Sequence, residues 1–467
     1  MACPQRVAIA VASSIGTPNA ANHPPPPRFQ YPLLKPRYNC YSSSSLSSSS
    51  SSSSAWKIAI VGSGPSGCYT AKYLLQHQKQ QQQQSSSLPS SIQIDVLERL
   101  PTAYGLVRYG VAPDHPEVKN VQNEFDDMMM THHTDDNNNS ATIGFFGNVK
   151  VGTDVSLEEL RQRYDVVVLA YGCESDRSLS IPGKDLDGIL TAREFVAWYN
   201  GHVDFEWVGP IVQKALATQP NNKNDETSKS NIVVIGHGNV AMDCARILAK
   251  TRDELDATDI ATRALDVVAP QSSSSSSTAA TTQNSKRQIH VVGRRGHIQG
   301  AFTIKELREL TRLPNADFFI RLEELERSKS TPASQEELKG SRPKTRIDKL
   351  LMDQATKTSS SDDNANDKKN QVHLRLLMNP IRFESDDGSS LARVVCERTQ
   401  LVGEQGQQNA KGTGEEEVFD AELVSVSMLG THILSLLFEK GKDVKAIFLT
   451  RLSPLLLSVI LQLYRHW

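Results

Sequence analysis

Two stretches of this 467-residue sequence share one pattern: an apolar run rich in β-branched residues, a glycine-rich turn, and then residues with helical periodicity. Residues 56–75 read WKIAIVGSGPSGCYTAKYLL and contain G-x-G-x-x-G. Residues 231–250 read NIVVIGHGNVAMDCARILAK and contain G-x-G-x-x-A. A strand, a glycine turn and a helix in this order are typical of dinucleotide-binding units. The two copies predict two nucleotide sites in one chain.

In the first copy, each glycine has its own physical role. Gly62 permits the tight turn, Gly64 lets backbone amides approach a pyrophosphate, and Gly67 lets the helix pack close to the strand. The helix N-terminus adds N–H groups and positive partial charge. The next apolar run, IQIDVLERL (92–100), is predicted to be the second strand, and Glu98 near its end is placed to hold a ribose hydroxyl. A glycine-rich turn without a ligand is the alternative.

The second copy differs where its partner strand ends. Gly236 and Gly238 form the turn, and Asn239 is expected to cap the helix or donate to a phosphate. The partner strand, RQIHVVGRRG (287–296), ends in Arg294 and Arg295 instead of an acid. Two guanidinium groups there suit a 2′-phosphate, which favours NADP over NAD. The alternative is an ordinary solvated strand end.

A third buried strand, YDVVVLAYG (164–172), completes an α/β pattern with parallel sheets. Between these elements lies the segment GLVRYGVAPDHPEVKNV (105–121), which resembles neither a regular helix nor a strand. Pro113 and Pro116 would make its backbone rigid, and we expect it to form a wall beside a flavin ring. A nicotinamide stacked on that flavin could pass a hydride to it.

Composition narrows the function further. The formal net charge is −2, so no global field suggests nucleic acid as a partner. The six cysteines show no C-x-x-C spacing, so nothing in their pattern argues for an iron–sulfur cluster or a zinc site, a redox dithiol is disfavoured, and a reducing compartment fits. Residues 1–55 are basic, serine-rich and free of Asp and Glu, as in an organelle transit peptide; a tail without function is the alternative. Several polar low-complexity tracts, at 76–91, 217–231, 272–277 and 357–370, are predicted to be surface loops.

Several longer motifs resemble the adrenodoxin reductase family, the mitochondrial ferredoxin–NADP reductases. They are YGLVRYGVAPDHPEVKNV, FFGNVKVGTDV, TAREFVAWYNGH, GHGNVAMDCARILAK and VGRRGHIQGAFTIKELREL. The resemblance is close over residues 56–325 and weaker to about 427. It implies an NADP domain inserted into a discontinuous FAD domain, both Rossmann-like, and transfer of electrons from NADPH through FAD to a [2Fe–2S] ferredoxin. It also implies mitochondrial location, with a plastid as the weaker alternative.

The resemblance assigns roles residue by residue. It implies FAD contacts at Gly62, Gly64, Ser66, Gly67, Glu98, Leu106 and Val151. It implies NADP contacts at Gly236, His237, Gly238, Asn239, Val240, Arg294, Arg295 and Glu306. It makes His115 and Glu306 the residues that act around hydride transfer, although a histidine between Asp and Pro is more often a structural group. A basic surface for an acidic ferredoxin is expected at Arg308, Arg342, Lys344, Arg346 and Lys349.

Composition and resemblance together predict four segments: a transit peptide or disordered tail (1–55), the first part of the FAD domain (56–176), the NADP domain (177–372) and the FAD-domain return (373–467). The return departs from the family after about residue 430, because the family motif G-W-x-x-R-G-P-x-G has no counterpart here. The chain could therefore be a reductase, or an altered product that binds NADP or ferredoxin but holds FAD poorly. A third alternative is another two-Rossmann reductase, such as an NADPH-feeding flavin subunit or a thioredoxin reductase. The sequence predicts no transmembrane helix and leaves peripheral membrane association open.

Overall fold

The computed structural model describes residues 7–10, 56–82, 91–132, 141–173, 179–217, 229–271, 286–360 and 370–427. Most of the expected transit peptide, much of each low-complexity tract and the divergent tail after residue 427 lie outside the described residues. Contacts divide the chain into two units. Unit 1 takes the described parts of Met1–Arg108 and Asn120–Cys173, and unit 2 takes those of Tyr109–Lys119 and Glu174–Thr431.

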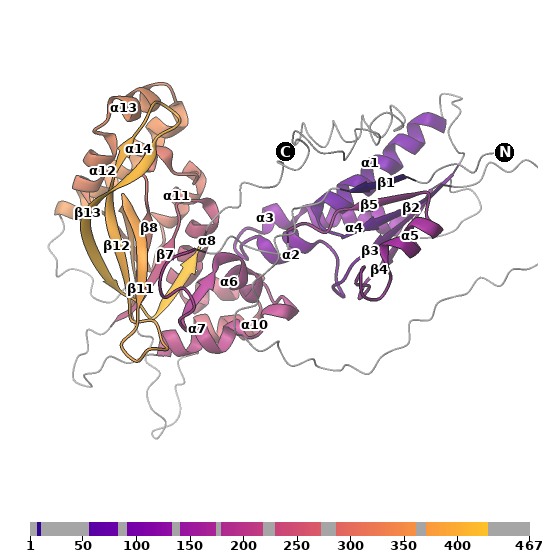
Figure 1. Cartoon of the computed structure of the whole chain (residues 1–467), viewed down its shortest axis with the longest axis horizontal. Coiled ribbons are helices and arrows are strands. Elements are labelled where there is room, and N and C mark those ends of the chain that lie inside the picture. Colours follow the sequence, from indigo (N-terminus) through magenta and orange to yellow (C-terminus); the bar gives the residue numbers. More distant parts are fainter. Residues whose placement is uncertain are drawn as a thin grey trace, which may run out of the picture. The chain divides into compact units, whose positions relative to one another are not determined.

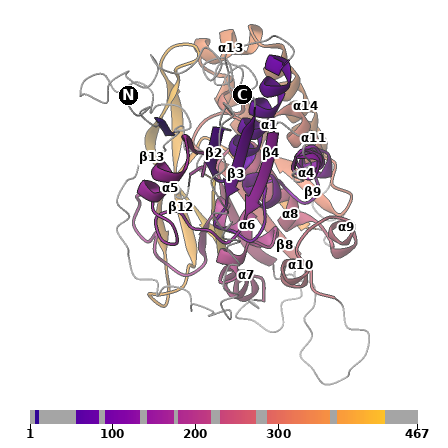
Figure 2. The ribbon, with the colours of Figure 1, turned by 90° about the vertical axis from the view of Figure 1, so that its right-hand side faces the viewer.

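Unit 1 is built on a five-stranded parallel sheet in the order β1-β5-β2-β3-β4 (Figure 1). Figure 2 shows β2, β3 and β4 side by side. The strands are β1 (Val7–Ala10), β2 (Trp56–Val61), β3 (Ile92–Leu97), β4 (Ala141–Phe146) and β5 (Val166–Leu169). The order β4-β3-β2-β5 is that of a mononucleotide-binding half, with its switch point between β2 and β5.

Successive side chains of β2 point to opposite faces of this sheet, and helices cover both faces. Ile58 and Ile60 face one side, where they pack with residues of α1 (Pro65–Gln82) and against Met128 of α4 (Val121–Thr131). Ala59 and Val61 face the other side, which α5 (Leu157–Arg163) covers. Strand β1 lies within the expected transit peptide, and its VAIA segment pairs in parallel with β5.

Unit 2 has three layers. Its central sheet is parallel, in the order β6-β14-β7-β8-β10-β9. Helices pack on one face around Val234 and Val291, and an antiparallel sheet, β11-β12-β13, packs on the other around Val233 and Val292 (Figure 1). The central strands are β6 (Ile189–Thr191), β7 (Lys229–Ile235), β8 (Lys286–Gly293), β9 (Ala316–Ile320), β10 (Asn370–Leu376) and β14 (Leu423–Val426). The antiparallel strands are β11 (Met378–Glu384), β12 (Arg393–Val402) and β13 (Asn409–Asp420).

The helices of unit 2 connect these strands. They include α6 (Ala192–Tyr199), α7 (Val208–Ala217), α8 (Asn239–Ala249), α9 (Arg252–Asp256), α10 (Thr262–Val268), α11 (Ile304–Leu310), α12 (Leu322–Lys329), α13 (Pro332–Lys339) and α14 (Arg342–Ser360). Short 3₁₀ turns cover Val203–Phe205 and His297–Gln299. Among the described helices, none has the length and apolar character needed to cross a bilayer.

Two further differences from the sequence expectation concern the segment 105–121 and the strands after residue 373. The segment 105–121 contains two short helices, α2 (Gly105–Gly110) and α3 (Pro116–Lys119), and Tyr109–Lys119 clusters with unit 2. Strands β11 to β14 also belong to unit 2, whereas residues from 373 on were expected in the return of the first domain. The reason is that β14 pairs with both β6 and β7 and so completes the central sheet. Which cofactor each domain serves stays a prediction.

A stack of aromatic rings between the two sheets of unit 2 gives the fold an acid-sensitive element. Phe319, His373 and His290 lie in register on β9, β10 and β8, with ring centroids 4.8 and 4.9 Å apart. Among the described side chains, His290 Nδ1 and His373 Nε2 are buried without a hydrogen-bond partner. Burial, and then nearby cationic groups, lowers the pKa of His290 to about 4 and that of His373 to about 3.

We expect the free energy of unfolding to fall as the pH drops below about 6.5, because the unfolded chain then binds protons that these folded imidazoles refuse. Each histidine should cost about 2 kcal/mol by pH 5. His373→Phe keeps a ring in the stack and should make the loss between pH 7.5 and pH 5 smaller by about that amount. Urea unfolding at both pH values measures this. Phe319→Leu is the control, because it disturbs the stack but should leave the pH dependence of the unfolding free energy unchanged. If His373→Phe lost as much stability between pH 7.5 and pH 5 as the parent, His373 would not be a source of the acid sensitivity.

Candidate functional site: two dinucleotide turns and a buried ionic cluster

The two glycine turns are built in the same way. Gly62 has φ +103° and Gly236 has φ +127°, in the left-handed region that favours glycine. A Cβ at Gly62 would lie 2.5 Å from the Ala170 carbonyl oxygen, and one at Gly236 would lie 2.4 Å from that of Ser427. Each contacted residue follows the strand across the switch point, β5 in unit 1 and β14 in unit 2. Each turn therefore lies where a doubly wound sheet binds its ligand.

In unit 1, the remaining glycines also occupy the positions expected for a pyrophosphate site. A Cβ at Gly64 would meet no atom within 4 Å, so this side of the turn is open to a ligand. A Cβ at Gly67 would lie 2.0 Å from the Gly62 carbonyl oxygen, which explains why the helix can pack so closely here only with glycine. Ser66 is exposed in the first turn of α1. The open backbone at Gly64 fits a dinucleotide phosphate.

Glu98 is buried directly after β3, beside this turn. Its Oε2 accepts hydrogen bonds from the Ser63 amide (2.9 Å) and hydroxyl (2.7 Å), and its Oε1 accepts one from the Leu100 amide (3.0 Å). A carboxylate has about four acceptor positions, so Glu98 can still accept from a ribose hydroxyl while it holds the turn. Leu106 is 64% exposed, and Val151 is partly buried in a bridge to Val155. Gly105, the residue before Leu106, lies against the turn, since a Cβ there would be 3.4 Å from the Gly64 Cα.

Ser63 and Tyr104 are turn residues that the sequence analysis missed. Tyr104 has φ +81°, an unusual value for a tyrosine, and its amide donates to the Ser63 carbonyl at 3.0 Å. Its hydroxyl bonds to Asp126 of α4. Ser63 could have been found as the residue inside G-x-G whose hydroxyl reaches the acid after β3. Nothing in the sequence signals the backbone conformation of Tyr104.

In unit 2, the helix after the turn begins one residue earlier than the capping prediction requires. Gly238 is the N-cap residue of α8, so the expectation that Asn239 caps the helix is wrong. Asn239 Oδ1 instead accepts a hydrogen bond from the Thr303 amide at 2.8 Å. Val240 packs partly buried against the core. The ring of His237 lies over Gly293, where a Cβ would come within 2.3 Å of its Nδ1.

The two units differ at the residue that is expected to bind the ribose, which is Gly293 in unit 2. The Gly62 amide donates to the carbonyl of Leu97, and the Gly236 amide donates to that of Val292, both at 2.8 Å. Glu98 and Gly293 are therefore equivalent positions, and Arg294 and Arg295 come next in unit 2. Both arginine side chains are exposed, while their carbonyls accept from Thr399 Oγ1 (2.7 Å) and the Leu377 amide (3.2 Å). Two exposed guanidinium groups on a backbone that these hydrogen bonds hold in place fit a phosphate that carries two charges.

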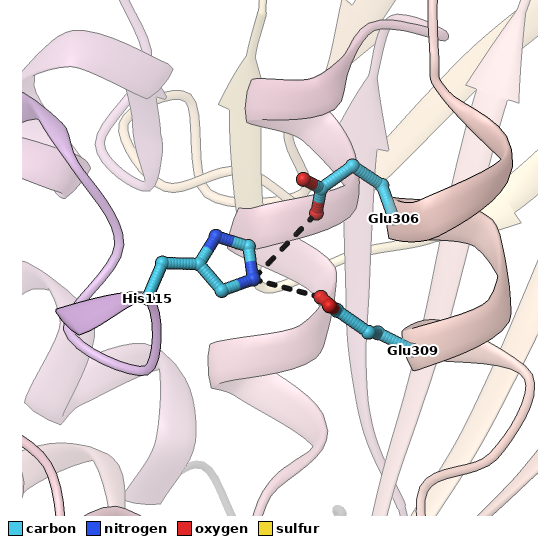
Figure 3. Close-up of side chains that lie close together, drawn as sticks. All are labelled: His115, Glu306 and Glu309. Carbon is cyan, nitrogen blue, oxygen red and sulfur yellow. Dashed lines mark hydrogen bonds and ion pairs between the residues drawn. The ribbon is translucent and has the colours of Figure 1, made fainter. Parts of the chain in front are cut away.

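His115 and Glu306 lie close together in unit 2, together with a carboxylate that the sequence analysis missed. His115 Nε2 lies 2.7 Å from Glu309 Oε2 and 3.9 Å from Glu306 Oε2 (Figure 3). Both glutamates project from α11, which Thr303 caps by accepting the Glu306 amide hydrogen. Burial, and then the nearby Asp243, raises the pKa of Glu306. The i,i+3 spacing of the two glutamates is the sequence signal that could have revealed Glu309.

A buried arginine completes the cluster. Arg246 of α8 is 1% exposed and donates to Asp114 through Nε (2.6 Å) and Nη2 (3.1 Å), and to Glu306 through Nη1 (3.1 Å). Burial alone would raise the pKa of Asp114, but Arg246 and Lys250 hold it below its usual range. The ligand atoms of His115, Glu306 and Glu309 lie within 4.8 Å of one another, a spacing that could suit a metal ion. The guanidinium already supplies positive charge to these carboxylates.

The expected docking residues lie on two helices of unit 2. Arg342, Arg346 and Lys349 are exposed on α14, and the partly buried Lys344 pairs with Glu337. Arg308 is exposed on α11.

Taken together, two parallel-sheet units with equivalent glycine turns define a protein of the two-dinucleotide oxidoreductase class. The pyridine nucleotide-disulphide oxidoreductase family matches residues 56–297. A mitochondrial NADPH:adrenodoxin oxidoreductase of Arabidopsis thaliana is 40% identical over 374 residues, which cover 79% of this chain and 66% of the relative. The human protein of that name is 36% identical over 80% of this chain and 65% of its own length.

Bacterial relatives match over a larger share of their length. The NADPH-ferredoxin reductase FprA of Mycobacterium tuberculosis is 38% identical over 79% of this chain and 69% of the relative. The structure of FprA in complex with NADPH has a TM-score of 0.64 and 36% identity, covering 80% of this chain and 70% of that one. This chain belongs to the family of NADPH:adrenodoxin oxidoreductases and NADPH-ferredoxin reductases. It spans 66% and 65% of the Arabidopsis and human relatives.

Proposed function

We propose that the chain is an NADPH-dependent flavoprotein that passes electrons from NADPH through FAD to a [2Fe–2S] ferredoxin. The observation that carries this proposal is the pair of equivalent turns, one followed by an acid and one by two arginines. FAD would be held by Gly62, Gly64, Ser66, Gly67, Glu98, Leu106 and Val151. NADP would be held by Gly236, His237, Gly238, Asn239, Val240, Arg294, Arg295 and Glu306.

In this mechanism the residues of the chain would bind and orient the two cofactors, and some of them would hold protons. The chemistry that the two cofactors supply when bound is hydride transfer to the flavin and onward release of electrons one at a time. The open backbone at Gly64 admits the pyrophosphate, and the Glu98 carboxylate orients a ribose. Arg294 and Arg295 hold the 2′-phosphate. His115 and Glu306 act in the reaction by fixing the nicotinamide end and by holding protons, because transfer of a hydride depends chiefly on orientation.

The proposed partner and location are supported by the family and by the charge of the chain. We place the ferredoxin on Arg308, Arg342, Lys344, Arg346 and Lys349, since an acidic iron–sulfur protein is attracted by exposed cationic side chains. The basic, acid-free composition of residues 1–55 and the mitochondrial names of three relatives support location in the mitochondrion. Such a docking surface predicts that the rate of electron transfer to the ferredoxin falls as salt rises.

The direct test is reduction of the flavin by NADPH. Protein supplied with excess FAD and passed through a desalting column is mixed anaerobically with NADPH or NADH. We expect flavin absorbance that bleaches with NADPH far faster than with NADH, and reduction of cytochrome c only when ferredoxin is added. Retained flavin that NADPH does not bleach would contradict the proposal. A chain that binds NADP but retains no flavin would instead support the alternative of an impaired product.

A further inference from the structure

The loop that follows β8 (residues 294–296), called the arginine loop below, is held by hydrogen bonds from two distant segments. Thr399 Oγ1 of β12 donates to the Arg294 carbonyl at 2.7 Å, and the Leu377 amide donates to the Arg295 carbonyl at 3.2 Å. The Thr399 amide in turn donates to the Leu377 carbonyl at 2.9 Å. One set of bonds therefore joins the arginine loop, the corner at Leu377 and β12.

The corner at Leu377 is a fixed support for this loop. Leu377 is the single residue between β10 and β11, which belong to different sheets. Its φ of +59° lies in the left-handed region, which is uncommon for leucine and persists only where the surroundings hold it. Leu377 is 4% exposed, and the buried Glu324 accepts a hydrogen bond from the neighbouring Leu376 amide at 2.8 Å. The backbone amide of Leu377 thus reaches the arginine loop from a position that cannot easily move.

The far end of the arginine loop is held by the next side chain along the chain. His297 is 1% exposed, and its Nδ1 lies 2.8 Å from Ser328 Oγ while its Nε2 lies 3.0 Å from Asp348 Oδ1. The near end is held because Gly293 belongs to β8. Between these two ends, the bond from Thr399 is made by a side chain, so a single substitution can remove it.

This arrangement matters most for a ligand with a charge at its 2′ position. Arg294 and Arg295 are exposed, so a phosphate that binds both must order two long side chains, which costs free energy. A backbone that is already held removes part of this cost and keeps the guanidinium planes directed at the phosphate. A nucleotide with a 2′-hydroxyl gains little from this, because it has no charge to pair. The Thr399 hydroxyl therefore acts on the difference between the two affinities.

We propose that Thr399 is a positioning residue for nucleotide selectivity, whose hydroxyl holds the arginine loop so that both guanidinium groups are presented to the 2′-phosphate of NADP. The inference rests on the proposed function, in which Arg294 and Arg295 bind that phosphate. Thr399 is 6% exposed and its hydroxyl donates to the Arg294 carbonyl. It acts through the arginines and does not itself bind the nucleotide.

The test uses adenosine 2′,5′-bisphosphate, which carries the 2′-phosphate without a nicotinamide, and adenosine 5′-monophosphate as the reference ligand. Both are titrated calorimetrically into the full-length protein. In Thr399→Ala, the bisphosphate should bind about five- to tenfold more weakly, while the affinity for the monophosphate stays within about twofold of the parent value. Thr399→Ser keeps the hydroxyl, differs from Thr399→Ala by one oxygen atom, and should bind both ligands as the parent does.

Equal affinities for the bisphosphate in Thr399→Ala and Thr399→Ser would overturn the proposal, as would equal weakening of both ligands in Thr399→Ala. Thr399→Val is a second variant without the hydroxyl, and it fills the space that alanine leaves empty. It should show the same selective loss, because the missing hydroxyl is what the two variants share. A parent-like affinity for the bisphosphate in Thr399→Val would contradict the proposal even if Thr399→Ala did not fold.

The matched control is Thr413→Val on β13. Thr413 Oγ1 donates to the carbonyl of Arg398, the residue before Thr399, at 2.9 Å. The substitution removes the same kind of bond from the same sheet but leaves the arginine loop in place. It should keep the affinity for the bisphosphate within about twofold of the parent value. A loss as large as that of Thr399→Val would show that the stability of the sheet, and not the arginine loop, governs binding.

The bisphosphate titration needs no flavin and no turnover, so it separates this inference from the proposed function. If the titration gives the expected pattern while NADPH fails to bleach bound flavin, the reductase function fails and the role of Thr399 stands. If NADPH bleaches the flavin while Thr399→Ala and Thr399→Ser bind the bisphosphate alike, the role of Thr399 fails and the reductase function stands. A parent that bound the bisphosphate no more tightly than the monophosphate would overturn the inference at its premise.

Discussion

Replacement of Arg294 and Arg295 by alanine is expected to weaken NADPH binding by about 10²- to 10⁴-fold, because charge-assisted hydrogen bonds to a phosphate contribute roughly 1.5–3 kcal/mol each. Binding of NADH should change little, since NADH lacks the 2′-phosphate. The fold should survive, because both side chains are exposed and the contacts that hold this loop use the two carbonyl oxygens. Calorimetric titration of both nucleotides measures the ratio of their dissociation constants.

The matched control is Arg327→Ala, which removes an exposed arginine of α12 that pairs with Glu323. It tests whether loss of any one surface cation is enough to weaken the binding of a polyanionic ligand. The affinities for NADPH and NADH should both stay within about twofold of the parent values. Equal weakening of NADPH and NADH in the double variant would show that the arginines hold the nucleotide elsewhere. In that case the proposed preference for NADP would have no structural basis.

The parts of the fold that sequence predicted are those fixed by neighbouring residues. A buried β-branched run followed by Gly62 or Gly236 has few alternatives to a strand and a tight turn, and both turns occur where they were expected. The end of β8 at Gly293 likewise places Arg294 at the carboxyl edge of the sheet. These features depend on backbone sterics and on continuous runs of buried apolar residues within about ten residues of chain.

The parts that sequence could not predict depend on contacts between distant residues. His115 and Glu309 are 194 positions apart, and Arg246 and Asp114 are 132 apart. An arginine on a helix ordinarily predicts a solvated face, and only the carboxylates that surround Arg246 make its burial favourable. The apolar run of β14 likewise does not say which sheet it completes, because any exposed parallel edge could accept it.

Gly64→Val is expected to yield a chain that folds and binds NADP normally but no longer retains FAD. A Cβ at this position would meet no protein atom within 4 Å, so the cost of the substitution to the fold should be small. The valine methyl groups would instead occupy the space through which the backbone amides approach the pyrophosphate. Loss of those charge-assisted hydrogen bonds should weaken FAD binding by about 100-fold or more, roughly 3 kcal/mol.

Gly67→Ala provides the contrast, because the two glycines are three residues apart and have different constraints. A Cβ at Gly67 would lie 2.0 Å from the Gly62 carbonyl oxygen, so this smaller substitution should lower the melting temperature of unit 1 even without ligand. Flavin absorbance after desalting, circular dichroism and NADP titration together separate a blocked site from a damaged fold. If Gly64→Val retained flavin in a one-to-one ratio, the pyrophosphate would not pass over Gly64. The open backbone there would then be a solvent-exposed turn with no part in binding.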